Sequence, residues 1–288
     1  MNVYNLGLLS CRDCFGSVKE CAMECQTRIL GIVNITEDSF SDGGRYLAPS
    51  AALAKARALV IDGAHAVDLG PASSHPDASE VTPQEEIQRL TPVVAALHAE
   101  GIAVSVDSWR PETQRWALQQ NVRWVNDIRG FPDPTLYPAL ADSDCGLIAM
   151  FSVQAAGRAD RRATDPAAVL AQIEAFFDER LTALEAAGVA RERVVVDPGM
   201  GFFLGSNPET SLAVLRAIPS LKARWGLPVL LSVSRKSFLR KLTGSPVEAI
   251  GAATLSGELY AARQGVDWLR THDARALRDA LLIQDALR

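Results

Sequence analysis

Residues 146–199 contain a strand–helix–strand pattern, with GLIAMF at 146–151, DPAAVLAQIEAFFDERLTALEAAG at 165–188 and VVVDPG at 194–199. The first and last of these runs are short and mainly apolar, which is typical of buried strands. In the middle segment apolar residues recur every three or four positions, and this spacing predicts a helix with one buried face. Asp165 before a proline is a typical helix N-cap, and Gly188 is a typical C-terminal stop.

The same alternation continues along the chain from residue 28. The eight apolar runs are Arg28–Thr36, Ala66–Gly70, Ala103–Ser108, Trp124–Ile128, Gly146–Phe151, Val194–Gly199, Val229–Ser234 and Trp268–Asp273. Mostly apolar strands predict a parallel sheet that is covered by helices. Eight such units favour a closed (β/α)8 TIM barrel, an α/β fold, over an open doubly wound sheet. No GxGxxG turn follows the first run, which further disfavours a dinucleotide-binding sheet.

Composition excludes several classes of function. Hydrophobic residues make up 48% of the chain, charged residues 22%, and the net charge is −5. No run of Lys or Arg forms a basic stripe, so nucleic acid is not an expected partner. No apolar stretch approaches the ~20 residues that span a bilayer, and no secretory signal precedes the first strand. We therefore expect a cytoplasmic protein that binds neither nucleic acid nor membrane.

The cysteines are concentrated at the N-terminus, where Cys11, Cys14, Cys21 and Cys25 lie. A CxxC pair suits a tetrahedral zinc site, but the second pair is CxxxC and only six residues separate the pairs. We expect residues 1–27 to be a dispensable Cys-rich extension and residues 28–288 to form one domain; Met23 is an alternative start of translation. Zinc binding is the alternative. Cys145 lies in an apolar context and is expected to be a core residue rather than a nucleophile.

Polar residues end or directly follow seven of the eight runs. They are Asn34, Ser73, Ser74, His75, Asp107, Asn126, Asp127, Asp197, Ser234, Arg235, Lys236, Ser237, Arg270 and His272. Barrel enzymes carry their active sites at the C-terminal ends of the strands, so this convergence predicts a ligand site there. For a single aspartate the alternative is a helix cap; Asp107, for example, could cap a helix that begins at Pro111.

The residue types indicate the chemistry of the ligand. Asp107, Asn126 and Asp197 offer acceptors that suit a ring with amine and N–H groups, and Lys236 can donate to a ring carbonyl. The cationic residues after the seventh and eighth runs lie where barrels commonly hold phosphate. The alternative for these cations is that they are solvated surface charges.

Six motifs resemble those of the dihydropteroate synthases, in the same order along residues 28–288. They are GIVNITEDSFSDGG at 31–44, VDS at 106–108, NDI at 126–128, DPGMG at 197–201, SRKS at 234–237 and RTH at 270–272. The resemblance implies condensation of 6-hydroxymethyl-7,8-dihydropterin diphosphate with 4-aminobenzoate, giving 7,8-dihydropteroate and pyrophosphate. It also implies an SN1-like mechanism, Mg2+ as the cofactor, and mobile loops over Thr36–Tyr46 and Pro71–Val81. We expect a homodimer.

Roles for individual residues follow from the resemblance. The expected pterin ligands are Asp107, Asn126, Asp197 and Lys236. Asn34 is expected to contact the Mg2+–pyrophosphate, with Arg270 and His272 on its oxygens. Met150 is expected to flank the pterin. The remaining expected substrate-binding residues, mainly around the aminobenzoate, are Ser74, His75, Pro76, Phe202, Phe203, Arg235 and Ser237.

Two motifs depart from the family pattern. Gly-Glu-Ser-Thr-Arg-Pro is replaced by PASSHP at 71–76, and Gly-Phe-Gly-Lys by GFFL at 201–204. These changes, with GFPDP at 130–134, resemble the mobile, sulfonamide-insensitive members. Two alternatives are a pterin-binding methyltransferase domain and a non-catalytic paralogue that only binds pterin. The intact first motif and SRKS argue against the methyltransferase, and the complete acidic and cationic sets argue against the paralogue.

Overall fold

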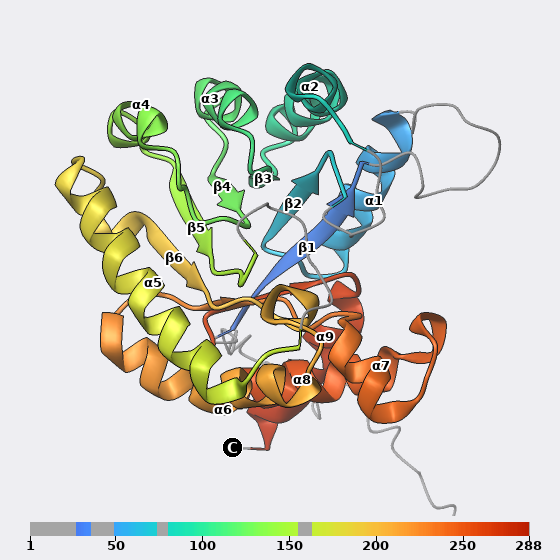
Figure 1. Cartoon of the computed structure of the whole chain (residues 1–288). Coiled ribbons are helices and arrows are strands. Elements are labelled where there is room, and N and C mark those ends of the chain that lie inside the picture. Colours follow the sequence, from blue (N-terminus) through green and yellow to red (C-terminus); the bar gives the residue numbers. More distant parts are fainter. Residues whose placement is uncertain (1–26, 36–48, 74–79, 155–162, 288) are drawn as a thin grey trace, which may run out of the picture.

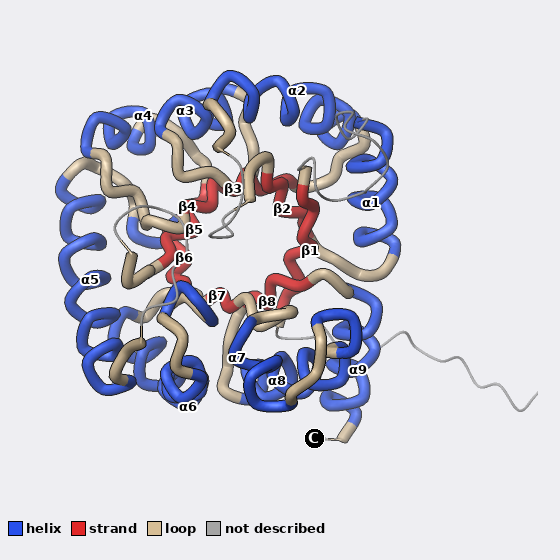
Figure 2. The backbone as a smooth tube through the Cα atoms, turned by 45° about the vertical axis from the view of Figure 1, so that its right-hand side comes forward, coloured by secondary structure: helices blue, strands red, loops and turns tan. Residues whose placement is uncertain are grey.

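The computed structural model describes residues 27–35, 49–73, 80–154 and 163–287. Their strands form a ring of eight parallel members (Figures 1 and 2). The strands are β1 (Arg28–Asn34), β2 (Ala66–Gly70), β3 (Val104–Asp107), β4 (Trp124–Asp127), β5 (Gly146–Met150), β6 (Val194–Asp197), β7 (Leu230–Leu231) and β8 (Trp268–Thr271). They pair in the order β6-β5-β4-β3-β2-β1-β8-β7, and a bridge between Val196 and Val229 closes the barrel.

Helices surround this ring on its outer side, as Figure 2 shows. They are α1 (Pro49–Ile61), α2 (Pro83–Ala99), α3 (Pro111–Gln119), α4 (Tyr137–Ala141), α5 (Pro166–Ala186), α6 (Pro208–Trp225), α7 (Ser237–Thr243), α8 (Gly251–Arg263) and α9 (Ala274–Ala286). The predicted cap of α5 is confirmed, because Asp165 accepts a hydrogen bond from the Ala168 amide at 2.9 Å. Gly188 has φ +90°, the left-handed conformation that stops a helix.

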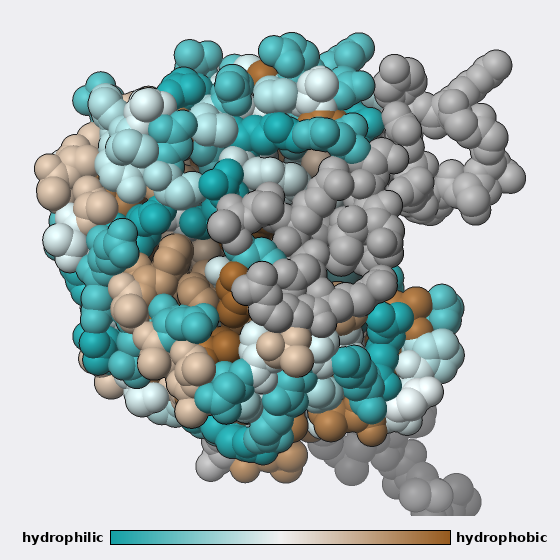
Figure 3. Space-filling model, viewed as in Figure 1, coloured by the Kyte–Doolittle hydropathy of each residue, from teal (hydrophilic) through white to brown (hydrophobic). Residues whose placement is uncertain are grey.

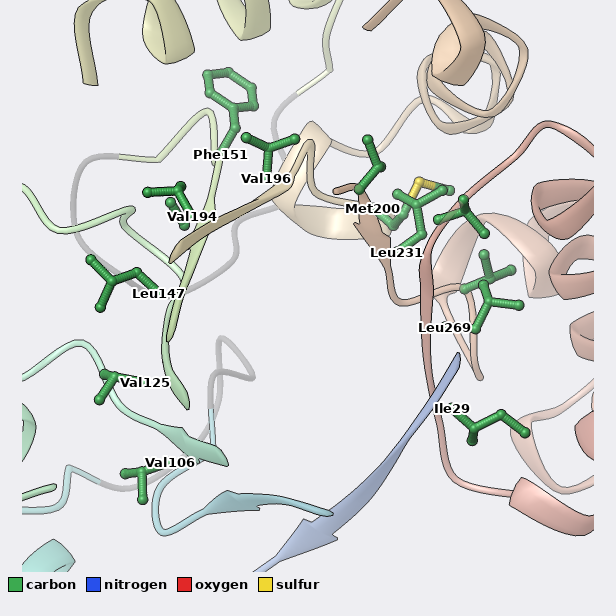
Figure 4. Close-up of a cluster of buried hydrophobic side chains, with 14 of the residues drawn as sticks. Ile29, Val106, Val125, Leu147, Phe151, Val194, Val196, Met200, Leu231 and Leu269 are labelled. Carbon is green, nitrogen blue, oxygen red and sulfur yellow. The ribbon is translucent and has the colours of Figure 1, made fainter. Parts of the chain in front are cut away.

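The main hydrophobic core lies between the strands and the helices. Figure 4 shows Val106, Val125 and Leu147 on the outer side of the ring, one from each of three neighbouring strands. Packing is close at Gly31, where a Cβ atom would lie 3.0 Å from the Leu59 side chain of α1. The outward positions therefore fix the helices against the barrel and leave the inward positions free for other roles.

The predicted (β/α)8 barrel is confirmed, and all eight predicted runs contain a strand. Several runs extend past the observed strand because their last residues turn into the loops; β7, predicted as Val229–Ser234, is only Leu230–Leu231. Hydrophilic residues cover most of the described outer surface seen in Figure 3. Within the described ranges, no helix has the length and apolar character of a membrane span.

Candidate active site

The inward-facing side chains nearest the N-terminal ends of the strands form an apolar layer, which we call the floor. Its members are Leu30, Ala66, Trp124, Ile148, Val195, Leu230 and Trp268. The two tryptophan rings meet edge to face, with 5.2 Å between their centroids. The floor encloses no space large enough for a water molecule. This end of the barrel interior is therefore a packed core and not a site.

Two residues further along four of these strands, the inward position is polar. The pairs are Ala66 and Asp68, Trp124 and Asn126, Val195 and Asp197, and Trp268 and Arg270. The step of two is the period of a β-strand, so each polar side chain faces the interior directly above the floor. With Asp107 of β3 and Lys236 after β7, they form what we call the polar layer.

Ion pairs and hydrogen bonds join the polar layer across four strands. Asp68 is fully buried, and its Oδ2 accepts from Asn126 Nδ2 at 3.0 Å and from Arg270 Nε at 2.5 Å. A second guanidinium nitrogen of Arg270 donates to Asp107 Oδ2 at 2.7 Å. One carboxylate of β2 thus holds the amide of β4 and the guanidinium of β8.

The two carboxylates that flank this network have raised pKa values. Burial raises the pKa of Asp107 to about 7; Arg270 opposes the shift and the nearby Asp68 adds to it. Burial also raises the pKa of Asp197 to about 6, against a 2.8 Å hydrogen bond from the Gly199 amide. Both groups take up protons close to neutral pH, as is common for carboxyls at functional sites.

Lys236 supplies the second cation of the polar layer. Burial lowers its pKa to about 8, an effect that Arg270 strengthens and Asp197 opposes. Its Nζ lies 5.1 Å from the centre of the Phe203 ring, a cation–π contact. Gly201 leaves room for this side chain, because a Cβ atom there would lie 3.3 Å from it. The ammonium is therefore held against the Phe203 ring and near the carboxylates.

An apolar wall stands beside the polar layer. Ile128, Met150 and Phe203 are buried together, with Trp109 and Phe202 packed partly buried against them. Phe202 and Phe203 lie on the short 3₁₀ helix Gly201–Leu204. An apolar wall beside a row of acceptors suits a flat heterocycle, because the wall covers its faces while the polar groups bind its edge.

The ends of β7 and β8 meet at His272. Its Nδ1 lies 2.9 Å from the Ser234 hydroxyl. Burial and then the neighbouring Arg235 lower its pKa to about 3, so this imidazole is neutral at physiological pH. Arg235 itself is exposed and has a left-handed φ of +59°, whereas Ser237, the first residue of α7, is buried.

Not all predicted site residues can be located. Asn34 is exposed at the end of β1, and its Oδ1 would lie 3.6 Å from a Cβ atom at Gly70, a position that is also 3.9 Å from Asp107 Oδ2. The side chains of Asn34 and Asp107 therefore flank the same point at the mouth. Ser74, His75 and Pro76 lie outside the described residues, as do the four N-terminal cysteines and most of both predicted loops.

Several alternatives from the sequence are now decided. Asp107 does not cap α3, because its carboxylate pairs with Arg270 and the N-cap position belongs to Arg110. Asp127 faces outward and accepts hydrogen bonds from Gln114 and from two backbone amides. Cys145 is buried, and burial raises its thiol pKa to about 12, so the prediction of a core residue is confirmed.

Asp68 is the central residue that our sequence reasoning missed. The predicted site residues end or follow their runs, whereas Asp68 lies in the middle of the run Ala66–Gly70. The signal was nonetheless present, since a carboxylate inside an apolar strand must face a polar partner. Counting two residues on from Ala66 would have placed it in the barrel interior.

Comparisons with known proteins agree with this geometry. The family model described as "Pterin binding enzyme" matches residues 30–272. A dihydropteroate synthase type-2 of Escherichia coli is 58% identical over 260 residues, which cover 90% of this chain and 96% of the relative. Among solved structures, the Xanthomonas albilineans dihydropteroate synthase with 4-aminobenzoic acid is 34% identical, with a TM-score of 0.82. The same synthase in complex with 7,8-dihydropteroate gives a TM-score of 0.78 at 33% identity. Both solved chains are matched over 93% of their length and cover 91% of this chain.

Proposed function

Because this chain belongs to the dihydropteroate synthase family of pterin-binding enzymes, we infer that it condenses 6-hydroxymethyl-7,8-dihydropterin diphosphate with 4-aminobenzoate. The products are 7,8-dihydropteroate and pyrophosphate. The observation that carries this inference is the polar layer, where three carboxylates, an amide and two cations meet beside an apolar wall.

The pterin ring occupies the polar layer in this proposal. Its amine and ring N–H groups donate to Asp107, Asn126 and Asp197, and its carbonyl accepts from Lys236. Met150 covers one face of the ring as part of the apolar wall. When the bond to the diphosphate breaks, the ring system becomes positive, and two carboxylates in a buried site stabilise that charge.

The diphosphate lies toward the mouth, near Asn34 and His272. Within the described ranges no cluster of three or more His, Cys, Asp or Glu side chains could hold a metal ion. A single amide oxygen at Asn34 fits Mg2+ all the same, because this ion prefers oxygen ligands and is commonly held by substrate phosphates with few protein groups. When bound, Mg2+ neutralises charge on the departing pyrophosphate.

The two residues expected on the pyrophosphate oxygens have different electrostatic character. His272 is neutral, so it acts as a hydrogen-bond donor rather than as a cation. Arg270 is held by Asp68 and Asp107, so its charge is shared between the leaving group and the polar layer. The aniline nitrogen then attacks the pterin methylene carbon, with the aminobenzoate placed by Arg235, Ser237 and Phe202.

An assay with both substrates tests the reaction. We expect release of one pyrophosphate per dihydropteroate formed, dependent on added Mg2+. A methyltransferase domain would release no pyrophosphate, and a non-catalytic paralogue would bind the dihydropterin diphosphate without turnover. Either result would overturn the proposed function. Light scattering of the same preparation tests the homodimer that we propose.

We further propose that the enzyme works in the presence of sulfonamides. The substrate ends in a planar carboxylate, whereas the drug carries a tetrahedral sulfonyl group with a further substituent, so bulk at that end excludes the drug. We propose that Phe202 and Phe203, on the 3₁₀ helix Gly201–Leu204, supply this bulk, because Phe203 stands where the family pattern usually has glycine. Phe203 also contacts Met150 and Lys236, so it borders the pterin pocket.

The sulfonamide proposal is tested with Phe203→Gly. We expect the inhibition constant of sulfamethoxazole to fall about tenfold or more in the variant, while the KM for 4-aminobenzoate changes by less than about threefold; tenfold corresponds to ~1.4 kcal/mol. Inhibition of the unchanged enzyme near the substrate KM would contradict the insensitivity. A silent variant of an insensitive enzyme would show that Phe203 is not its source.

A further inference from the structure

Asp68 lies between the floor and the expected ligand. It contacts Asn126 and Arg270, two residues that are expected to bind that ligand. Its side chain is fully buried in the middle of β2, and its Oδ2 accepts from both Asn126 Nδ2 and Arg270 Nε. Arg270 in turn holds Asp107. The Asp68 carboxylate is thus held by two hydrogen bonds to one oxygen, of which the bond from the guanidinium is charge-assisted.

The contact with Asn126 determines which way that amide faces. A carboxylate can only accept hydrogen bonds, so the amide nitrogen of Asn126 must point toward Asp68. The amide oxygen therefore points away from Asp68. In the described part of the chain this buried oxygen, Asn126 Oδ1, has no hydrogen-bond partner.

A buried acceptor without a partner costs free energy unless a ligand supplies a donor. If the amide were turned over, its nitrogen would face the ligand instead, and two donors would meet at the ring edge. Without Asp68 the two amide orientations differ little, because Asn126 would lose the one acceptor that its nitrogen reaches among the described residues.

We propose that Asp68 is a positioning residue: it fixes the Asn126 amide so that the oxygen faces the pterin ring as an acceptor for a ring donor. This inference rests on the proposed function, because it takes the pterin as the ligand of the polar layer. The oxygen of Asp68 that carries this role is Oδ2; its Oδ1 is buried and has no partner within the described ranges. Asp68 acts through Asn126, with Arg270 holding its carboxylate in place.

A double-mutant cycle between Asp68→Ala and Asn126→Ala tests the inference. We expect Asp68→Ala alone to lower kcat/KM for the dihydropterin diphosphate by about 10- to 100-fold, the size of one lost buried hydrogen bond to a charged group. In the Asn126→Ala background the same change should cost several-fold less, and the cost that remains is the effect of Asp68 on Arg270. The KM for 4-aminobenzoate should stay within about twofold of the parent in every variant.

Ser105→Ala is the matched control. Ser105 is paired with Asp68 in the strand register, is equally buried, and its hydroxyl has no hydrogen-bond partner within the described ranges. We expect the control to keep the parent kcat/KM. If Asp68→Ala does not give the circular dichroism spectrum of a folded barrel, Asp68→Asn enters the same cycle, with a smaller effect because its oxygen can still accept.

Different results would contradict the positioning role of Asp68 and the proposed synthase activity. Equal costs of the Asp68 change with and without Asn126 would overturn the positioning role, because a general structural or electrostatic effect is additive. A parallel rise in the KM for 4-aminobenzoate would overturn it as well. Absence of pyrophosphate release by the unchanged enzyme would instead overturn the proposed function itself.

Discussion

The floor and the polar layer occupy neighbouring levels of the same barrel interior, two residues apart on the strands. The floor is apolar and leaves no room for water. The polar layer holds three carboxylates, two cations and an amide, and two of its buried oxygens, Asp68 Oδ1 and Asn126 Oδ1, have no partner within the described ranges. The same backbone geometry therefore supports opposite kinds of interior.

This difference separates stability from function inside one barrel. Packed apolar side chains stabilise the fold through burial. Buried charges destabilise it unless they are paired, and the raised pKa values of Asp107 and Asp197 report that cost. A ligand with matching donors removes the cost, so substitutions at the two levels should affect different measurements.

The largest effect is expected for the polar layer. Lys236→Ala and Asp107→Asn should each lower kcat/KM by about 30- to 1000-fold, equivalent to ~2–4 kcal/mol of lost transition-state stabilisation. The melting temperature should stay close to that of the parent, because neither side chain belongs to the apolar floor. Steady-state kinetics and thermal denaturation of the two variants measure both quantities. Parent-like kcat/KM in either variant would remove that residue from the site.

The floor should give the opposite result. Leu230→Ala removes a side chain that is 1% exposed and is expected to lower the free energy of unfolding by about 2–5 kcal/mol. Urea denaturation measures this loss, and kcat/KM per folded molecule should remain within about twofold of the parent. A tenfold fall in kcat/KM would contradict the separation of the two levels, because the floor would then shape the site as well as the core.

The pH dependence of kcat/KM should come from the polar layer alone. Asp107 and Asp197 must both be ionised to accept from the ring, so activity should fall about tenfold per pH unit between about 7 and 6 and about a hundredfold per unit below both pKa values. Lys236 must be protonated to donate, so activity should also fall above a pH of about 8. Leu230→Ala should leave the fall of kcat/KM at low pH and its fall at high pH unchanged. A flat profile between pH 5 and 9, measured as kcat/KM for the dihydropterin diphosphate, would contradict the assigned roles.

The strand pattern predicted the barrel because each apolar run is short and is separated from the next by a segment with helical periodicity. This alternation does not depend on the exact ends of the strands. Residues at strand ends, such as Asp107 and Asp197, could be placed at the mouth by the same pattern. The pairing of Arg270 with Asp68 could not, because a contact across the barrel depends on register and tilt. Nor could the neutrality of His272, since burial lowers its pKa.

The smallest effect is expected from the N-terminal segment, which enters the barrel at the floor end. Thr27 and Arg28 enter β1 at the floor end, where Thr27 donates to the Val266 carbonyl at 3.0 Å and Arg28 lies over the Trp268 ring. We propose that the first 25 residues are dispensable. A chain that begins at Met23 keeps both of these contacts.

A chain beginning at Met23 should therefore match the full chain in kcat/KM, in both pH limbs and in melting temperature. Loss of stability with unchanged kcat/KM would mean that the removed residues support the floor. Loss of activity with unchanged stability would mean that they reach the mouth and act with the polar layer. One zinc ion per full-length chain, absent after truncation, would instead favour a zinc site at Cys11, Cys14, Cys21 and Cys25. Because the floor and the mouth are opposite ends of the barrel, kinetics and thermal denaturation together distinguish these outcomes.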